Sequence, residues 1–147
     1  MTGVQTCALP NLGGTSAQGI APNKAGYGTL LDDVIQVDAD DIEAMSVAME
    51  KNKGRLAAVI AEPVQGAGGV FPATVEYLQG LRKLCDQHGA YLIYDEVITG
   101  FGRLGEWFGA THYGVIPDMI TFAKAVTARA KKAAVSMMSV KAATAGQ

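Results

Sequence analysis

The stretch YLIYDEVITGFGRLGEWFG, from Tyr91 to Gly109, decides the fold. It opens with a short apolar run, Tyr91–Tyr94, which predicts a buried strand. Asp95 and Glu96 follow where that strand should end. Open α/β sheets bind ligands at the edge formed by the carboxyl ends of their parallel strands. The two acids could also be a charged turn that simply ends the strand, so the rest of the chain must decide between these readings.

Two further apolar runs end in a charged residue. Leu56–Ala61 is followed by Glu62, and Met119–Ala123 is followed by Lys124. A helix is expected between the first two runs, over Thr74–His88, because its apolar residues recur at helical spacing. The expected inner stripe of this helix consists of Val75, Leu78, Leu81 and Cys85.

This order of strands and helix predicts an α/β fold with a mainly parallel sheet and flanking helices. Successive strands of a parallel sheet point the same way. Glu62, Asp95 and Lys124 are therefore expected at one edge of the sheet. Three charged groups of mixed sign at one edge favour a functional site over unrelated turns.

The remaining segments give weaker signals. Residues Asn11–Gly28 are rich in Gly, Pro, Asn and Ser and predict a loop, and Leu30–Val37 is a candidate short strand. A helix should begin after Asp41, with Ile42, Met45 and Met49 on one face. The glycine cluster Gln65–Gly69 favours a tight turn over a phosphate cradle, because no helix follows it directly.

Composition excludes several classes of protein. The 147 residues suffice for one domain, and 49% hydrophobic with 18% charged residues is typical of a globular protein. A net charge of −2 disfavours a nucleic-acid or anionic-membrane surface. No apolar run approaches the ~20 residues that span a bilayer, and no secretory signal is evident. Cys7 and Cys85 have neither metal-site spacing nor a disulfide pattern, so a cytoplasmic protein is expected.

Both ends of the chain differ from its middle. Met1–Pro10 has no charge and no periodicity, and it resembles a translated sequencing adapter, so we exclude it from fold reasoning. Arg129–Gln147 contains four basic residues and no acid, and it could form an alanine-rich helix or a strand at Val135–Val140. We expect both ends to pack poorly.

A lysine that faces a carboxylate in an apolar pocket suits two roles. One is a structural ion pair, and the other is a Schiff-base lysine whose pKa is lowered by burial. Pyridoxal phosphate needs such a lysine, together with an aspartate that keeps its ring nitrogen protonated. Lys124 and Asp95 supply both residue types at strand ends.

Four ordered motifs carry a family resemblance. They are AEPVQGAGG (Ala61–Gly69), YDEVITGFGR (Tyr94–Arg103), EWFG (Glu106–Gly109) and PDMITFAK (Pro117–Lys124). With these motifs, residues 11–128 resemble class III, or omega, aminotransferases, which are fold-type I pyridoxal-phosphate enzymes. This implies a partial cofactor-binding large domain over residues 11–128, followed by a divergent tail over 129–147.

The resemblance implies a role for each matched residue. Lys124 would be the lysine that binds pyridoxal 5′-phosphate, and Asp95 would be the partner of its ring nitrogen. Val97 would pack on one face of the ring, and Glu62 would belong to the network beside the site. The implied partners are a small-molecule amine donor and a keto-acid acceptor such as pyruvate. The full-length parent would be a homodimer or a dimer of dimers.

Departures from the family pattern narrow this reading. Ile98 stands where some members carry a glutamine, and Ala67 stands where the 4-aminobutyrate branch carries a glutamate. With the GEWFG stretch, the chain looks most like amine– or β-alanine–pyruvate aminotransferases. The family's phosphate loop, ring-stacking aromatic and carboxylate-binding arginine have no counterpart here, so the isolated chain should show no transamination.

Other functions share some of these features. An aminomutase or a decarboxylase of the same fold would use the same lysine and aspartate, and a truncated α/β domain without catalytic activity would need neither. A nucleotide triphosphatase could also end a strand in Asp-Glu, but the sequence has no G-x-x-x-x-G-K-[ST] loop.

Overall fold

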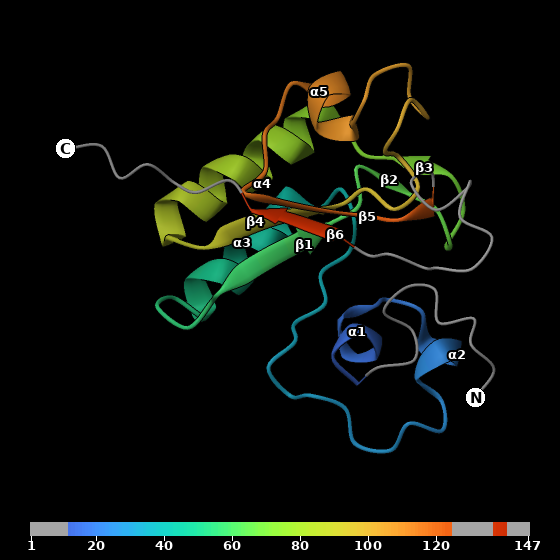
Figure 1. Cartoon of the computed structure of the whole chain (residues 1–147). Coiled ribbons are helices and arrows are strands. Elements are labelled where there is room, and N and C mark those ends of the chain that lie inside the picture. The colour runs from blue at the N-terminus through green and yellow to red at the C-terminus, as the bar shows by residue number, and fades with distance from the viewer. Residues whose placement is uncertain (1–11, 125–136, 141–147) are drawn as a thin grey trace.

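A four-stranded sheet forms the centre of the computed structural model, which describes residues 12–124 and 137–140 (Figure 1). Its strands, in spatial order, are β1 (Ala58–Ala61), β4 (Tyr91–Asp95), β5 (Met119–Phe122) and β6 (Met137–Val140). The pairs β1–β4 and β4–β5 are parallel, and β6 is antiparallel to β5. The mainly parallel sheet predicted from the three apolar runs is therefore confirmed.

The longest helix, α4 (Val75–His88), connects the first two parallel strands as predicted. The hydroxyl of Thr74 accepts a hydrogen bond from the Tyr77 N–H and caps its start. Gly89 ends the helix in the left-handed conformation, at φ 67°, which glycine adopts without steric cost.

The inner face of α4 differs from the predicted stripe at one position. Leu78, Leu81 and Cys85 are fully buried, as expected. Val75 was expected there too, but its side chain is 39% exposed, because it lies in the first turn, beyond the sheet. Tyr77 is buried in its place.

The second helix of the core is α3 (Ile42–Lys51), and it packs against α4. The carboxylate of Asp41 accepts a hydrogen bond from the Ala44 N–H and caps its start, as the sequence predicted. Ile42 lies so close to Gly80 of α4 that a Cβ at that glycine would stand 2.7 Å from the isoleucine side chain. The close approach of the two helices therefore depends on that glycine.

These helices cover one face of the sheet. Val59, Leu92 and Tyr94 point toward them and are buried. Strand geometry directs alternate residues to opposite faces, and Ile60 and Tyr91 on the other face are 51% and 53% exposed.

The segment before α3 differs from its prediction. Residues expected to form a loop contain two short helices, α1 (Leu12–Ala17) and α2 (Ala21–Lys24), drawn in blue in Figure 1. The Ser16 hydroxyl donates to the Leu12 carbonyl and accepts from the Leu31 N–H, which ties α1 to the following segment. The candidate strand at 30–37 does not form, because no neighbouring strand pairs with it, and Leu31 and Ile35 are each 50% exposed.

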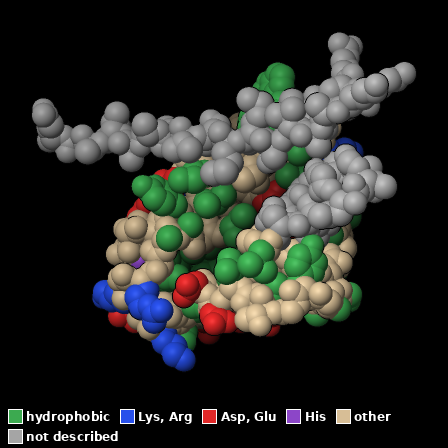
Figure 2. All heavy atoms as spheres, turned by 60° about the horizontal axis from the view of Figure 1, so that its bottom comes forward, with side chains coloured by type: hydrophobic (Ala, Val, Ile, Leu, Met, Phe, Trp, Pro, Cys, Tyr) green, Lys and Arg blue, Asp and Glu red, His purple; other side chains and the backbone are tan. Residues whose placement is uncertain are grey.

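The ends of the chain are described only in part. The described residues do not include 1–11, 125–136 and 141–147. The prediction that the ends pack poorly concerns mostly these residues, so it stays a prediction. Of the two structures considered for the tail, the described residues show the strand, as β6. None of the helices in the described ranges is long and apolar enough to cross a membrane. On the face shown in Figure 2, hydrophobic side chains form several separate groups, and Lys and Arg side chains gather at the lower left corner.

Asp118 joins α4 to the sheet just before β5. One of its carboxylate oxygens accepts from the Leu92 N–H at 2.7 Å and from Arg82 Nη1 at 2.8 Å. Partial burial pushes the pKa of Asp118 up, but the bond from Leu92 and the hydrogen bond and charge of Arg82 outweigh it, so the pKa lies below its usual value. Arg82 also bonds Asp86, a more exposed carboxylate one turn away.

Replacing Asp118→Asn should lower the free energy of unfolding at pH 7 by about 1.5 kcal/mol or more, because charge-assisted hydrogen bonds are lost. A lowered folded-state pKa means that this stabilisation is complete above the unfolded pKa and disappears as the pH falls through the folded one. The difference from wild type in urea unfolding should therefore narrow below roughly pH 4.

Asp86→Asn is the matched control, because the Asp86 side chain is 65% exposed. It should change stability by about 0.5 kcal/mol or less. Equal losses in the two variants would show that Asp118 is an ordinary surface partner of Arg82.

Candidate functional site

The register of the parallel strands brings two carboxylates to the same level of the sheet. Ala61 pairs with Tyr94, so Glu62 and Asp95 follow side by side. Asp95 in turn pairs with Thr121 of β5, and Lys124 lies shortly beyond that strand. The charged residues at the carboxyl ends of the three strands thus lie at one edge of the sheet.

The pKa of Glu62 reflects the charges around it. Burial raises the pKa of Glu62 above its usual value, and the hydrogen bond from the Gly66 N–H opposes that shift. Asp95 raises the same pKa further, and Lys124 lowers it. Glu62 therefore interacts electrostatically with both the Asp95 carboxylate and the Lys124 ammonium, as expected for a cluster of mixed charge.

Lys124 differs from its expectation in one respect. The sequence suggested a lysine in an apolar pocket, but the Lys124 side chain is exposed among the described residues. It lies two residues beyond the end of β5.

Asp95 is held at its other side by its own loop. The Val97 N–H donates to Asp95 Oδ1 at 3.0 Å, a local turn that directs the partly buried carboxylate. Val97 itself is half-buried beside it. The predicted contact of Val97 with a cofactor ring stays a prediction.

The glycine cluster after Glu62 is a turn, as favoured from the sequence. It joins β2 (Val64–Gln65) to β3 (Phe71–Pro72), a small antiparallel pair. The Gly66 N–H donates to Glu62 Oε2 at 3.1 Å, so the carboxylate fixes the first residue of the turn.

Gly66 also interlocks with the loop after β4. A Cβ at this position would stand 1.8 Å from Ile98 Cδ1, so the isoleucine side chain would have to move to make room for it. The turn after β1 and the loop after β4 therefore pack closely against each other.

Sequence reasoning missed the role of Glu96. Its side chain is 0% exposed, and its carboxylate accepts hydrogen bonds from the Thr99 hydroxyl at 2.9 Å, the Ala110 N–H at 2.8 Å and the Gly109 N–H. The alternation of a buried strand was the available signal, because it directs adjacent residues to opposite sides.

The aromatic loop after Glu96 folds onto itself. Phe101 adopts a left-handed backbone conformation, at φ 61°, and its ring packs edge-on against Phe108 and Phe122 at 5.3 Å each. Trp107 is 70% exposed, and its ring packs edge-on against Phe101 with the ring centroids 6.3 Å apart. Arg103 is exposed as well.

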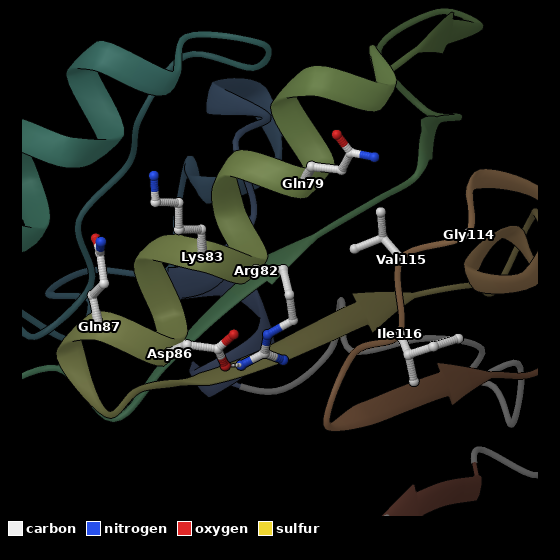
Figure 3. A pocket seen from close by; sticks show the side chains of 8 residues that line it. All are labelled: Gln79, Arg82, Lys83, Asp86, Gln87, Gly114, Val115 and Ile116. Carbon is white, nitrogen blue, oxygen red and sulfur yellow. Dashed lines mark hydrogen bonds and ion pairs between the residues drawn. The ribbon is translucent and has the colours of Figure 1, made fainter.

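An open groove of about 490 Å³ lies elsewhere, between α4 and residues 114–116 (Figure 3). Its walls include Arg82 and Asp86, which form an ion pair with each other. Val115 and Ile116 precede β5, so the groove lies toward the opposite end of that strand from Lys124. The groove is therefore separate from the charged cluster.

Comparison with known proteins agrees with this arrangement. The family model of class III aminotransferases matches residues 15–142. The chain belongs to the class III aminotransferase family. Members of this family are pyridoxal-phosphate-dependent enzymes, which confirms the family and the cofactor class suggested by the sequence motifs.

Individual class III relatives cover most of this chain. A succinylornithine transaminase/acetylornithine aminotransferase from Pseudomonas aeruginosa is 46% identical over 69% of the chain and 24% of its own length. A succinylornithine transaminase from Salmonella paratyphi B is 48% identical over 76% of the chain and 26% of its own length. The chain thus spans about a quarter of the length of these curated relatives.

Solved class III structures show the same fold. A transaminase from the marine bacterium Virgibacillus matches 89% of the chain and 31% of its own chain, with a TM-score of 0.81 and 35% identity. The ornithine aminotransferase from Toxoplasma gondii matches 90% of this chain and 30% of its own, with a TM-score of 0.81 and 28% identity. The relatives do not single out amine– or β-alanine–pyruvate aminotransferases, so that subfamily assignment is not supported.

The interlock of Gly66 and Ile98 gives a test of the site's geometry. Gly66→Ala should destabilise the chain by about 1–3 kcal/mol in urea unfolding, because its methyl group overlaps Ile98. Adding Ile98→Ala should restore part of that loss, since the shorter side chain leaves room for the methyl group.

Gly68→Ala is the matched control in the same turn. A Cβ there meets nothing within 4 Å, and the backbone is not left-handed, so the change should stay within about 0.5 kcal/mol. If Gly66→Ala were as mild as Gly68→Ala, the close packing of the two loops would not matter for stability.

Proposed function

We propose that this chain is part of a pyridoxal-phosphate-dependent aminotransferase that moves an amino group from an amine or omega-amino acid to a keto acid such as pyruvate. The observation that supports this most is the cluster at one sheet edge, where Asp95 and Lys124 both act on Glu62. Family membership gives the reaction class to which such a cluster belongs.

The residues present fit the cofactor by their chemistry. An amine that can attack a carbonyl is supplied by Lys124, and its exposure leaves it accessible to an aldehyde. Asp95 supplies a carboxylate that can bind a protonated ring nitrogen. The orientation of this carboxylate is set by the hydrogen bond from the Val97 N–H. When bound, pyridoxal phosphate serves as an electron sink for the carbon that carries the amino group.

Each residue then has a distinct task. Asp95 would hold the ring nitrogen and favour its protonated form, because a nearby negative charge stabilises the proton there. Lys124 would hold the cofactor through its amine, and its Nζ atom could also hold and move a proton. Val97 would line one face of the ring.

Glu62 contributes by position. Its carboxylate holds the Gly66 turn and lies within electrostatic reach of both Asp95 and Lys124. Burial raises the pKa of Glu62 above its usual value, and the neighbouring charge of Asp95 raises it further.

The amino donor is proposed from the relatives. The sequence relatives are named for ornithine derivatives, compounds that carry an amino group at the end of a carbon chain. This favours omega-amino acids among the donors. A full-length parent, proposed here as a homodimer or dimer of dimers, would supply the phosphate-binding and carboxylate-binding groups.

The proposal can be tested on the 147-residue chain by chemical trapping. After incubation with pyridoxal 5′-phosphate and reduction with borohydride, peptide mass spectrometry should find the label mainly on Lys124. Asp95→Asn should lower the apparent affinity about tenfold, since it removes a charge-assisted contact of about 1.5 kcal/mol.

Lys83 provides the control, because it is an exposed lysine on α4 that lines the separate groove and does not belong to the cluster. Lys83→Ala should leave the labelling of Lys124 unchanged, whereas Lys124→Ala should remove most of the total label. Labelling of another lysine at the wild-type yield in Lys124→Ala would refute the assignment.

A further inference from the structure

We propose that Glu96 is a positioning residue for Asp95, and this inference rests on the proposed function. Glu96 does not belong to the charged cluster, since its side chain is fully buried on the other side of the chain. It acts by fixing the peptide unit whose N–H directs the Asp95 carboxylate. The following contacts carry this inference.

The Glu96 carboxylate is held by three donors, from the Thr99 hydroxyl and the N–H groups of Gly109 and Ala110. Burial of a carboxylate is unfavourable unless hydrogen bonds compensate it, and bonds to an ionised acceptor are the strong ones. This carboxylate therefore ties the start of the aromatic loop to its far end, thirteen residues later in the sequence for Gly109.

Two glycines make room for this arrangement. A Cβ at Gly109 would stand 3.1 Å from Glu96 Oε2 and 3.0 Å from Pro63. A Cβ at Gly100 would stand 2.9 Å from the Glu96 carbonyl oxygen. The absence of a side chain at Gly109 and Gly100 thus leaves room for the carboxylate and the carbonyl group of Glu96.

The link to Asp95 runs through one peptide unit. The Glu96 carbonyl accepts from the Gly100 N–H at 2.9 Å, and the Val97 N–H of the same planar unit donates to Asp95 Oδ1 at 3.0 Å. On the preceding side, the Glu96 N–H donates to the Thr121 carbonyl of β5 at 2.8 Å. With the carboxylate anchored as well, this peptide unit has little freedom to rotate.

Loss of the carboxylate anchor should therefore affect the cluster without removing any member of it. In Glu96→Gln, the amide group brings a donor toward N–H groups that need an acceptor. The loop would then hold the 96–97 peptide less firmly, and the Val97 N–H would direct Asp95 less well.

The test measures the ratio of cofactor label on Lys124 to label on Lys83 in the same molecules, after incubation with pyridoxal 5′-phosphate and borohydride reduction. Glu96→Gln should lower this ratio about threefold or more. Glu106→Gln, an exposed acid in the same loop, should leave it unchanged. An unchanged ratio in Glu96→Gln would overturn the proposal.

A double-mutant cycle separates positioning from a general structural effect. If Glu96 acts through Asp95, Glu96→Gln should have no further effect on the ratio when Asp95→Asn is already present. Independent, multiplicative losses would overturn the proposal. A wild-type chain that shows no preference for Lys124 would instead refute the proposed function itself.

Circular dichroism checks that each variant is folded. If Glu96→Gln does not fold, Thr99→Val serves in its place, because it removes only one of the three donors to the carboxylate and keeps the side-chain shape. It should lower the ratio by a smaller factor and again have no effect beyond Asp95→Asn. An unchanged ratio in folded Thr99→Val would then count against the positioning role.

Discussion

Parallel, in-register pairing of β1, β4 and β5 is the constraint on which the candidate site depends. Each strand contributes backbone pairing and apolar side chains, and the charged residues lie at the last position of the strand or just beyond its carboxyl end. Since Ala61 and Tyr94 are paired, the next residue of each strand is a carboxylate at the same level. A shift of one residue in this register would separate Glu62 from Asp95 and turn the buried side chains to the wrong face. The burial of Leu92 and Tyr94 under α4 therefore fixes the geometry of the charged cluster as well as the core.

Two adjacent acids have different tasks because a strand directs neighbouring residues to opposite sides. Asp95 stays partly exposed and in contact with the cluster, whereas Glu96 is buried and satisfied by hydrogen bonds from the loop and from the start of the next helix. The first can interact with a ligand, and the second secures the backbone that directs the first. This division explains why a pair of acids at a strand end is more than a charged turn in this chain.

The sequence predicted the features that depend on local apolar patterns. The three parallel strands, helix α4 and the helix after Asp41 follow from runs and stripes of apolar residues, and so does the edge at which Glu62, Asp95 and Lys124 meet. Features that depend on distant partners were missed. The segment 30–37 has suitable residues for a strand but no neighbour to pair with, and α1 is tied to a later segment by the Leu31 N–H, which donates to the Ser16 hydroxyl. The buried role of Glu96 depends on Gly109 and Ala110, which lie far along the chain, so it does not follow from spacing alone.

The central claim is that Glu62, Asp95 and Lys124 form one electrostatic cluster at the carboxyl edge of the sheet. The most direct test is an NMR titration of the Glu62 carboxyl carbon in the wild-type chain and in Asp95→Asn and Lys124→Met. Glu62 should titrate above the usual glutamate value in the wild type. Its pKa should fall when the neighbouring negative charge of Asp95 is removed and rise when the positive charge of Lys124 is removed. A Glu62 pKa that is the same in all three chains would contradict the cluster.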